Sequence, residues 1–254
     1  MNRIYWDRDK ISILTDQIES IEHKHYAIQL FLSIDKPLNL YVSGKLIAGK
    51  CVIVNHNVNH AFSTGNKLHL SIIIEPASNI AKQLEMKMNG NDFRILDDFG
   101  IEKIQNIVFE LAYCQKDNEL NYYQYLIDTL YEYINLDVKI KVYDNRIREV
   151  LNYTEKCTCT VHTISFLADM VSLSRSRLSH LFREQVGIPL KSYIQFHQMQ
   201  KAFFALLSGK TITEAAMLAN FDSPSHFAAV TKRMMGMPAS LSSKNSVFLK
   251  VYDV

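Results

Sequence analysis

The sequence predicts a two-domain α+β protein, with an N-terminal antiparallel β-barrel followed by helices and a C-terminal all-helical domain. Short runs of alternating apolar and polar residues fill roughly the first 95 positions, which is typical of a small antiparallel barrel or sandwich. A helical spacing of apolar residues takes over from residue 101. An internal repeat in the C-terminal part completes the pattern.

The composition indicates a globular protein. Its 254 residues are 48% hydrophobic and 21% charged, which supports packed cores. No run reaches the roughly 18 uncharged apolar residues of a membrane span, and the first ten residues lack the apolar core of a signal peptide. We therefore expect a cytoplasmic protein with no membrane partner. The spacing of Cys51, Cys114, Cys157 and Cys159 suits neither a zinc knuckle nor a redox motif, so reduced structural thiols are expected.

The charge differs between the two halves of the chain. Residues 1–142 hold 15 basic and 18 acidic side chains, whereas residues 143–254 hold 13 basic and 8 acidic ones. A basic excess confined to the C-terminal part is expected if only that part meets a polyanion such as DNA. The margin is modest, so the interpretation depends on the motifs.

Four segments are predicted along the chain. The barrel is expected over residues 1–95, with strands at residues 28–34, 38–42, 51–54 and 68–74. A linker of residues 96–138 contains two amphipathic helices, 101–115 and 119–134, and the second is rich in tyrosine. A helix beginning near Asp144 opens the segment 139–243. The apolar tail, 244–254, has no assigned element.

The C-terminal segment contains an internal repeat. Residues Ile164 to Leu173 align with Ile212 to Phe221, and most apolar and alanine positions coincide. Each copy predicts a short helix, a tight turn and a second helix opened by a capping residue, which is a helix-turn-helix. The first copy has Ser174 as the cap and Gly187 as the stop. In the second copy Asp222 or Ser223 is the cap, with Pro224 in the first turn and Gly236 as the stop.

A long helix is predicted between the two copies. Apolar residues recur with helical spacing from Pro189 to Leu207, and Gly209 follows as the stop. A helix of about 19 residues rises roughly 28 Å. This length is close to the ~34 Å between successive faces of a DNA major groove. One rigid rod could therefore hold two recognition helices in adjacent groove segments.

These motifs resemble the C-terminal DNA-binding domain of the AraC/XylS family of bacterial regulators. The resemblance covers about residues 144–240 and is carried by the stretch Ile164 to Pro189, by Ala202, by Phe221-Asp-Ser-Pro-Ser-His-Phe227 and by Lys232-Arg-Met-Met-Gly236. The second half departs from the family pattern. Gln198 replaces a common arginine, Asn220 a common glycine and Ala229 a frequent arginine, and Pro238 lies one position early. The second recognition helix is therefore expected to be the weaker reader of DNA.

The resemblance assigns candidate DNA contacts in both recognition helices. It implies that Ser176, Ser179 and His180 meet base edges, while Arg175 and Arg183 reach phosphates or guanine acceptors. In the second helix the base-facing positions are Ser225, Ala228 and Ala229, and Lys232 and Arg233 could anchor the DNA backbone. The alternative is that the arginines only solvate an exposed helix face, and the repeat makes this alternative weaker.

The segment from His23 to Gln29, together with His60, resembles the cupin-type sensory domains of this family. Strand alternation places His23 and His25 on one face. Metal-binding cupins carry a glutamate where this chain has Gln29, which leaves a neutral ligand set and weakens an enzymatic interpretation. Three interpretations remain: polar groups that line an effector pocket, a bound divalent metal, or ordinary hydrogen-bonded barrel residues.

Together these features predict a sequence-specific transcription regulator that is not an enzyme. Its expected partners are double-stranded DNA, a small-molecule effector, a second copy of the chain through residues 101–134, and RNA polymerase if the protein activates transcription. The alternative for the two helices of residues 101–134 is that they pack only on their own barrel. The alternatives are a metal-dependent cupin enzyme fused to a DNA-binding module, which requires turnover, and a nucleoid-type binder, which requires affinity that barely depends on sequence. No cofactor is expected apart from the divalent metal already considered.

Overall fold

The computed structural model divides the chain into two compact units. It describes residues 2–7, 9–16, 19–63, 65–96, 100–113, 118–136, 142–156, 163–235 and 246–251. Unit 1 comprises residues 1–138, 233–237 and 244–254. Unit 2 comprises residues 139–232 and 238–243.

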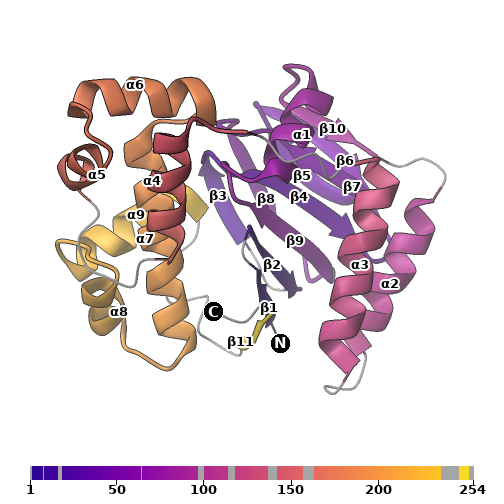
Figure 1. The fold of residues 1–254 in the computed structure, drawn as a ribbon. Coiled ribbons are helices and arrows are strands. Elements are labelled where there is room, and N and C mark those ends of the chain that lie inside the picture. The colour runs from indigo at the N-terminus through magenta and orange to yellow at the C-terminus, as the bar shows by residue number, and fades with distance from the viewer. Residues whose placement is uncertain are drawn as a thin grey trace. The chain divides into compact units, whose positions relative to one another are not determined.

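Unit 1 is built around two β-sheets (Figure 1). The strands are β1 (Asn2–Trp6), β2 (Lys10–Thr15), β3 (Glu19–His23), β4 (Ile28–Ser33), β5 (Leu38–Val42), β6 (Lys45–Gly49), β7 (Cys51–Val54), β8 (His60–Ser63), β9 (His69–Ile74), β10 (Phe93–Ile95) and β11 (Ser246–Lys250). One sheet has the order β10-β7-β4-β9-β2-β1-β11, and the other has the order β3-β8-β5-β6. The prediction of an antiparallel β domain is confirmed at this level, and closure of the sheets into one barrel stays a prediction.

Strand β4 lies inside the larger sheet, between β7 and β9, and all six of its residues are buried. Alternation sends its side chains to opposite faces. Ile28, Leu30 and Leu32 belong to the main apolar core. Phe31 belongs to a second core that includes Leu40 and residues of the smaller sheet. The strand therefore faces helices on one side and the second sheet on the other.

The described residues of unit 1 also form three helices: α1 (Asn79–Met88), α2 (Ile101–Tyr113) and α3 (Glu119–Ile134). The amphipathic patterns predicted α2 and α3, whereas α1 was not predicted. Ile104 and Val108 of α2 and Leu126 of α3 share the main core with β4. Figure 1 shows α2 and α3 side by side against the larger sheet. Cys51 is a buried cysteine outside any disulfide among the described residues, and the other three cysteines lie outside the described residues.

The apolar tail that the sequence could not place forms an edge strand of unit 1. Strand β11 pairs in parallel with β1, with Asn2 opposite Ser246 and Trp6 opposite Lys250. Leu249 and Val251 pack against the main core. The apolar character of the tail is therefore explained by burial beside the first strand, a contact that joins opposite ends of the sequence.

The described residues of unit 2 form helices and no strands (Figure 1). They are α4 (Asn145–Lys156), α5 (Ile164–Met170), α6 (Arg175–Val186), α7 (Leu190–Leu207), α8 (Ile212–Leu218) and α9 (Pro224–Met235), of which the last three residues are counted with unit 1. Pairs α5/α6 and α8/α9 are the two predicted helix-turn-helix copies, and α7 is the predicted connecting helix. Among the described residues, the sequence repeat thus located α5, α6, α8 and α9, and the apolar spacing between the copies located α7.

A buried polar network attaches the larger sheet to α3. The hydroxyl of Tyr5 donates to Glu119 Oε1 at 2.7 Å, and the Tyr5 ring stacks on Tyr123 with centroids 4.4 Å apart. The Tyr123 hydroxyl lies 2.8 Å from Ser12 Oγ. Arg3 Nη1 lies 3.4 Å from the same Glu119 oxygen. Burial and the neighbouring Glu119 carboxylate raise the pKa of Tyr5, so its hydroxyl remains a donor at neutral pH.

We expect Tyr5→Phe to lower the free energy of unfolding of unit 1 by about 1 to 3 kcal/mol, because a buried carboxylate loses a hydrogen-bond donor. Trp6 is the single tryptophan of the chain and lies in β1, so its fluorescence during urea denaturation reports on this unit. Tyr125→Phe is the matched control, since Tyr125 is 51% exposed. Equal stabilities of the two variants would contradict a structural role for the Tyr5 hydroxyl.

Candidate functional site

Side-chain caps set the boundaries of the first helix-turn-helix. Thr163 Oγ1 accepts a hydrogen bond from the Phe166 backbone N–H, and Ser174 Oγ accepts one from Arg177. Such caps satisfy backbone donors that a helix start leaves free. Gly187 ends α6 with a φ of 92°, a left-handed conformation that glycine adopts readily. The predicted cap and stop of α6 are confirmed.

The buried side of α6 determines which of its side chains face solvent. Leu178, Leu181 and Phe182 are buried. At 100° per residue, the middle of the opposite face holds Ser176, His180 and Arg183, and all three are exposed.

Arg175 and Ser179 lie to one side of this face. Arg175 is exposed in the first turn, whereas Ser179 is half-buried. The Ser179 hydroxyl donates to the Arg175 carbonyl oxygen at 2.8 Å. Its hydrogen is therefore engaged within the helix, and the hydroxyl can offer a base edge an acceptor.

Two charged residues of α6 were not predicted to lie on this face. Arg177 and Glu184 are both exposed, at the opposite edge of the same face from Arg175. The sequence contained the signal for both positions, because helical spacing counted from the apolar Leu178 and Leu181 places Arg177 and Glu184 on the exposed face. Glu184 puts a negative charge beside Arg183 in sequence, so the face is not uniformly basic.

The second copy repeats this arrangement with different chemistry. Thr211 and Glu214 form a reciprocal capping box at the start of α8. Ser223 Oγ accepts from the His226 N–H at 3.0 Å, so the cap of α9 is Ser223 rather than Asp222. Pro224 is the first residue of α9, as predicted. Gly236 lies outside the described residues.

Helix α9 exposes all five of its predicted DNA-contact residues. These are Ser225, Ala228, Ala229, Lys232 and Arg233. Phe227, Val230 and Met234 are buried on the opposite side. The exposed face thus carries one hydroxyl and two methyl groups in its first half and two cations in its second half.

Two departures from the family pattern contact each other. Gln198 of α7 donates from Nε2 to the Asn220 carbonyl oxygen at 3.1 Å. Asn220 adopts a φ of 61° in the turn between α8 and α9. This left-handed region suits glycine best, and asparagine is one of the residues that tolerate it. The Gln198 side chain therefore attaches the connecting helix to the second turn.

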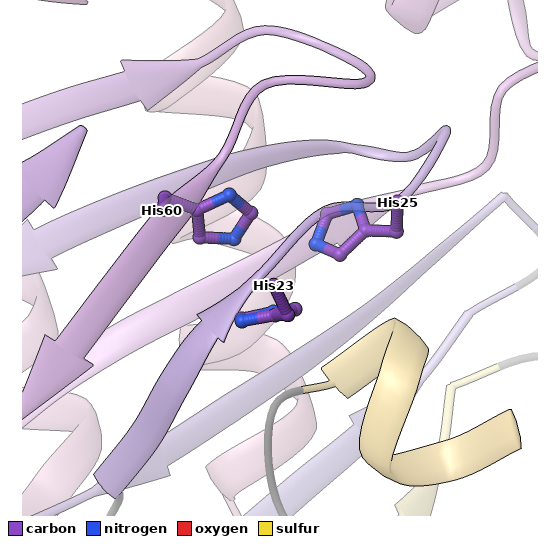
Figure 2. Close-up of side chains that lie close together, drawn as sticks. All are labelled: His23, His25 and His60. Carbon is purple, nitrogen blue, oxygen red and sulfur yellow. The ribbon is translucent and has the colours of Figure 1, made fainter. Parts of the chain in front are cut away.

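The histidines His23, His25 and His60 form a cluster in unit 1, shown in Figure 2. One ring nitrogen from each lies within 4.8 Å of the others, and all three residues are buried. The His23 and His60 ring centroids are 4.3 Å apart, and those of His25 and His60 are 5.0 Å apart. His23 ends β3, whereas His25 lies in the loop before β4. The prediction that one strand carries both was wrong, because β3 stops two residues before His25.

Backbone carbonyls orient all three rings through their Nδ1 atoms. His23 Nδ1 lies 2.8 Å from the Ile21 oxygen, His25 Nδ1 2.9 Å from Ala27, and His60 Nδ1 2.9 Å from Val58. A carbonyl oxygen can only accept, so each Nδ1 carries the hydrogen. A neutral imidazole has one N–H, and Nε2 is therefore left with a free lone pair.

Gln29 of β4 reaches the cluster from the larger sheet. Its Oε1 lies 3.1 Å from His25 Nε2 and 3.1 Å from His60 Nε2. Its Nε2 lies 2.8 Å from Ser71 Oγ. The structure thus brings together all four residues of the predicted effector or metal site, and their role stays a prediction.

Burial keeps the cluster neutral. Desolvation is the largest cause of the shift in each ring, and it lowers the pKa of His25 to about 4 and that of His60 to about 3. Desolvation also lowers the pKa of His23. All three imidazoles are consequently uncharged at neutral pH, with one hydrogen each.

A cavity of about 10 Å³ adjoins the cluster. Its lining includes His23, His25, Gln29 and His69. His69 is fully buried, and burial lowers its pKa to about 4. Its Nε2 has no hydrogen-bond partner among the described residues. A space of this size holds about one water molecule.

Comparisons with known proteins support the interpretation of unit 2. A protein-family model described as "Helix-turn-helix domain" matches residues 167–243. The arabinose operon regulatory protein of Escherichia coli (strain K12) is 33% identical over 99 residues, which are 38% of this chain and 34% of that protein. The chain thus spans about a third of the length of this relative.

A second relative aligns over most of the chain. It is the probable transcriptional regulator LumQ of Photobacterium leiognathi, which is 25% identical over 226 residues. The alignment covers 85% of this chain and 88% of LumQ.

Solved structures of ToxT from Vibrio cholerae share the fold of both units. An apo form superposes with a TM-score of 0.58 at 11% identity and covers 92% of this chain and 96% of that one. A form described as unsaturated fatty acid bound has a TM-score of 0.54 at 13% identity and covers 92% of each chain. Identities this low support the fold alone.

These matches and the two capped helix-turn-helix copies define the class of protein. Unit 2 carries a helix-turn-helix domain over residues 167–243, and the chain is similar in sequence to the arabinose operon regulatory protein and to LumQ. The named relatives are regulators rather than enzymes. Among the described residues, every helix is too short or too polar to cross a membrane.

We expect Arg183→Ala to weaken binding to all DNA sequences and to reduce the salt dependence of affinity by about one unit of slope, because one phosphate contact is lost. Fluorescence anisotropy over a series of salt concentrations measures both. Arg94→Ala is the control, since it removes the same charge from an exposed position of β10 in unit 1. An unchanged slope in the Arg183 variant would remove Arg183 from the DNA contacts.

Proposed function

We propose that the protein is a sequence-specific transcription regulator that binds double-stranded DNA through α6 and α9 and responds to a small ligand bound by unit 1. The observation that carries this proposal is the pair of capped recognition helices. Each buries one apolar face and exposes the face that the family uses for DNA. Its site of action would be the cytoplasm, with RNA polymerase as a further partner if it activates transcription.

The two helices would divide the work of recognition. On α6, Ser176, Ser179 and His180 would meet base edges, and Arg175 and Arg183 would contact phosphates or guanine. On α9, Ser225, Ala228 and Ala229 would face the bases, and Lys232 and Arg233 would hold the backbone. Alanine offers a base only a methyl contact. Specificity would therefore come mostly from α6, with DNA shape contributing at the α9 half-site.

The connecting helix has a suitable length for this arrangement. Helix α7 spans 18 residues, from Leu190 to Leu207, which is a rise of about 27 Å. The major groove returns to the same side of DNA after about 34 Å. The packing of Phe182 on Tyr193, with ring centroids 5.2 Å apart, attaches α6 to this rod. Two recognition helices on such a rod would read successive groove segments.

Unit 1 would supply the regulatory input. The ToxT structures that share this fold include one described with a bound unsaturated fatty acid, which supports a ligand-binding role for such a unit. In this chain the proposed effector site is the cluster of His23, His25 and His60 with Gln29. The two sheets around it would form a cupin-like barrel.

Helices α2 and α3 would pair two copies of the chain. Phe109 and Tyr113 of α2 are 49% and 69% exposed, and their rings lie 4.7 Å apart. Tyr125 of α3 is 51% exposed, and Lys103 lies over its ring. Adjacent exposed aromatic side chains are typical of the core of a protein interface. A symmetric dimer would cover them with the same surface of a second copy.

Selection of bound sequences from random DNA by the full-length protein tests the central proposal. We expect a two-part motif, and we expect His180→Ala to relax base preference in one part by roughly 1 to 3 kcal/mol. Ala229→Gly is the comparison and should change preference little. Absence of any enriched motif would contradict sequence-specific binding, and equal losses from both substitutions would contradict the leading role of α6.

The dimer surface is tested by a double substitution, Phe109→Glu with Tyr113→Glu. Two buried carboxylates would be costly at an interface, so the variant should sediment as a monomer at concentrations where the wild type is a dimer. The control is Met86→Glu, which changes a 79% exposed apolar residue of α1. A dimer that survives the double substitution would place the contact elsewhere.

A further inference from the structure

The histidine cluster presents lone pairs inward with no hydrogen among them. Each Nδ1 hydrogen is donated outward to a backbone carbonyl, so His23, His25 and His60 are left with unprotonated Nε2 atoms. Protein metal sites use the same arrangement, in which a carbonyl holds the outer ring nitrogen and the inner one binds the ion. The local backbone thus prepares three imidazoles as metal ligands.

The position of Gln29 strengthens this interpretation. Its amide oxygen lies 3.1 Å from the Nε2 atoms of both His25 and His60. Oxygen and nitrogen lone pairs that face each other in a buried space repel unless a cation or a hydrogen lies between them. A cation would satisfy them directly. In the metal-free chain the amide can turn, so that its N–H groups donate to the two rings and its oxygen accepts from Ser71.

The distances suit a small metal ion. Metal–nitrogen and metal–oxygen bonds of about 2.1 Å place neighbouring ligand atoms roughly 3.0 Å apart in an octahedral site and about 3.4 Å apart in a tetrahedral one. The two contacts of Gln29 fall in this range at 3.1 Å. One ring nitrogen of each histidine lies within 4.8 Å of the others, so the side chains would have to move closer together to bind one ion.

The space beside the cluster suits a small ligand such as an ion. Its volume of about 10 Å³ is enough for one water molecule or one ion. His69 Nε2, which is buried and lacks a partner among the described residues, belongs to a side chain that lines this space. It could accept a hydrogen bond from a water molecule that completes the coordination of the ion.

We propose that the Nε2 atoms of His23, His25 and His60 and the Oε1 atom of Gln29 bind one divalent transition-metal ion. Imidazole nitrogens favour zinc, copper, nickel, cobalt and iron over magnesium and calcium, which prefer oxygen ligands. Four neutral ligands leave the charge of the ion uncompensated, so an open position would take hydroxide or an anionic ligand. The assignment rests on the proposed function in one respect, since it makes this ion the ligand to which the regulator responds.

Metal binding would connect the two sheets of unit 1. His23 and His60 lie on neighbouring strands of the smaller sheet, and Gln29 lies on β4 of the larger one. His25 lies in the loop that joins β3 to β4. In the metal-free chain the Gln29 amide would link the sheets through hydrogen bonds to the histidine rings. In the metal-bound chain the ion would link them through direct bonds to residues of both sheets. The metal-bound and metal-free chains would thus differ in how the sheets are held together.

The test uses full-length protein stripped with chelator and then titrated with cobalt or zinc ions. We expect one equivalent of cobalt per chain, with visible absorption bands, and displacement by zinc. His25→Asn and His60→Asn are designed to keep an N–H donor in the place of Nδ1 while removing Nε2. Each should weaken cobalt binding at least about 100-fold. His56→Asn is the control, because His56 is half-buried beside Glu85 and outside the cluster.

A second measurement does not depend on the variants. X-ray absorption of the zinc-loaded wild type should show scattering from three imidazole rings. Absence of stoichiometric binding, fewer than two imidazoles, or full binding by both cluster variants would overturn the metal site. DNA affinity measured on the same samples separates the two proposals. If the protein binds DNA but no metal, only the metal assignment is rejected. If it binds metal but no DNA, only the DNA-binding function is rejected.

Discussion

The burial of β4 on both faces is the constraint on which the architecture of unit 1 depends. Because successive side chains of a strand point in opposite directions, Leu30 is placed in the core beneath the helices, while Gln29 and Phe31 face the second sheet. A shift of one residue in its register would exchange these two sets. The strand therefore controls both the packing of α2 and α3 and the polar end of the histidine cluster.

Unit 2 depends on a similar division between buried and exposed faces, now with helical spacing. Leu178, Phe182 and Phe227 are completely buried, and this anchoring decides which side chains α6 and α9 present. The caps at Ser174 and Ser223 fix where each helix starts and so fix the rotation of its exposed face. The two copies have kept the scaffold and differ in the chemistry of that face.

A ligand of unit 1 can change DNA binding only if it binds one arrangement of the protein more tightly than another. The same coupling free energy must then appear in the reverse direction, as an effect of DNA on ligand affinity. A site that bridges two sheets is well suited to this role, because filling it favours one way of holding them together. A neutral cluster also needs no proton loss before it binds a cation, since burial already lowers the pKa of each ring.

The sequence by itself determined the features that arise from local spacing. The repeat located α5, α6, α8 and α9 and the cap of α6, the apolar spacing located α7, and the exposed faces of α6 and α9 followed from the period of the helix. The tertiary structure decided what depends on contacts between distant residues. Strand β11 pairs with β1 from the other end of the chain, His25 joins the cluster from a loop, and Gln198 bonds to Asn220. Local propensity carries no information on such pairings, because they are selected by burial and by hydrogen bonds that form only once the chain has folded.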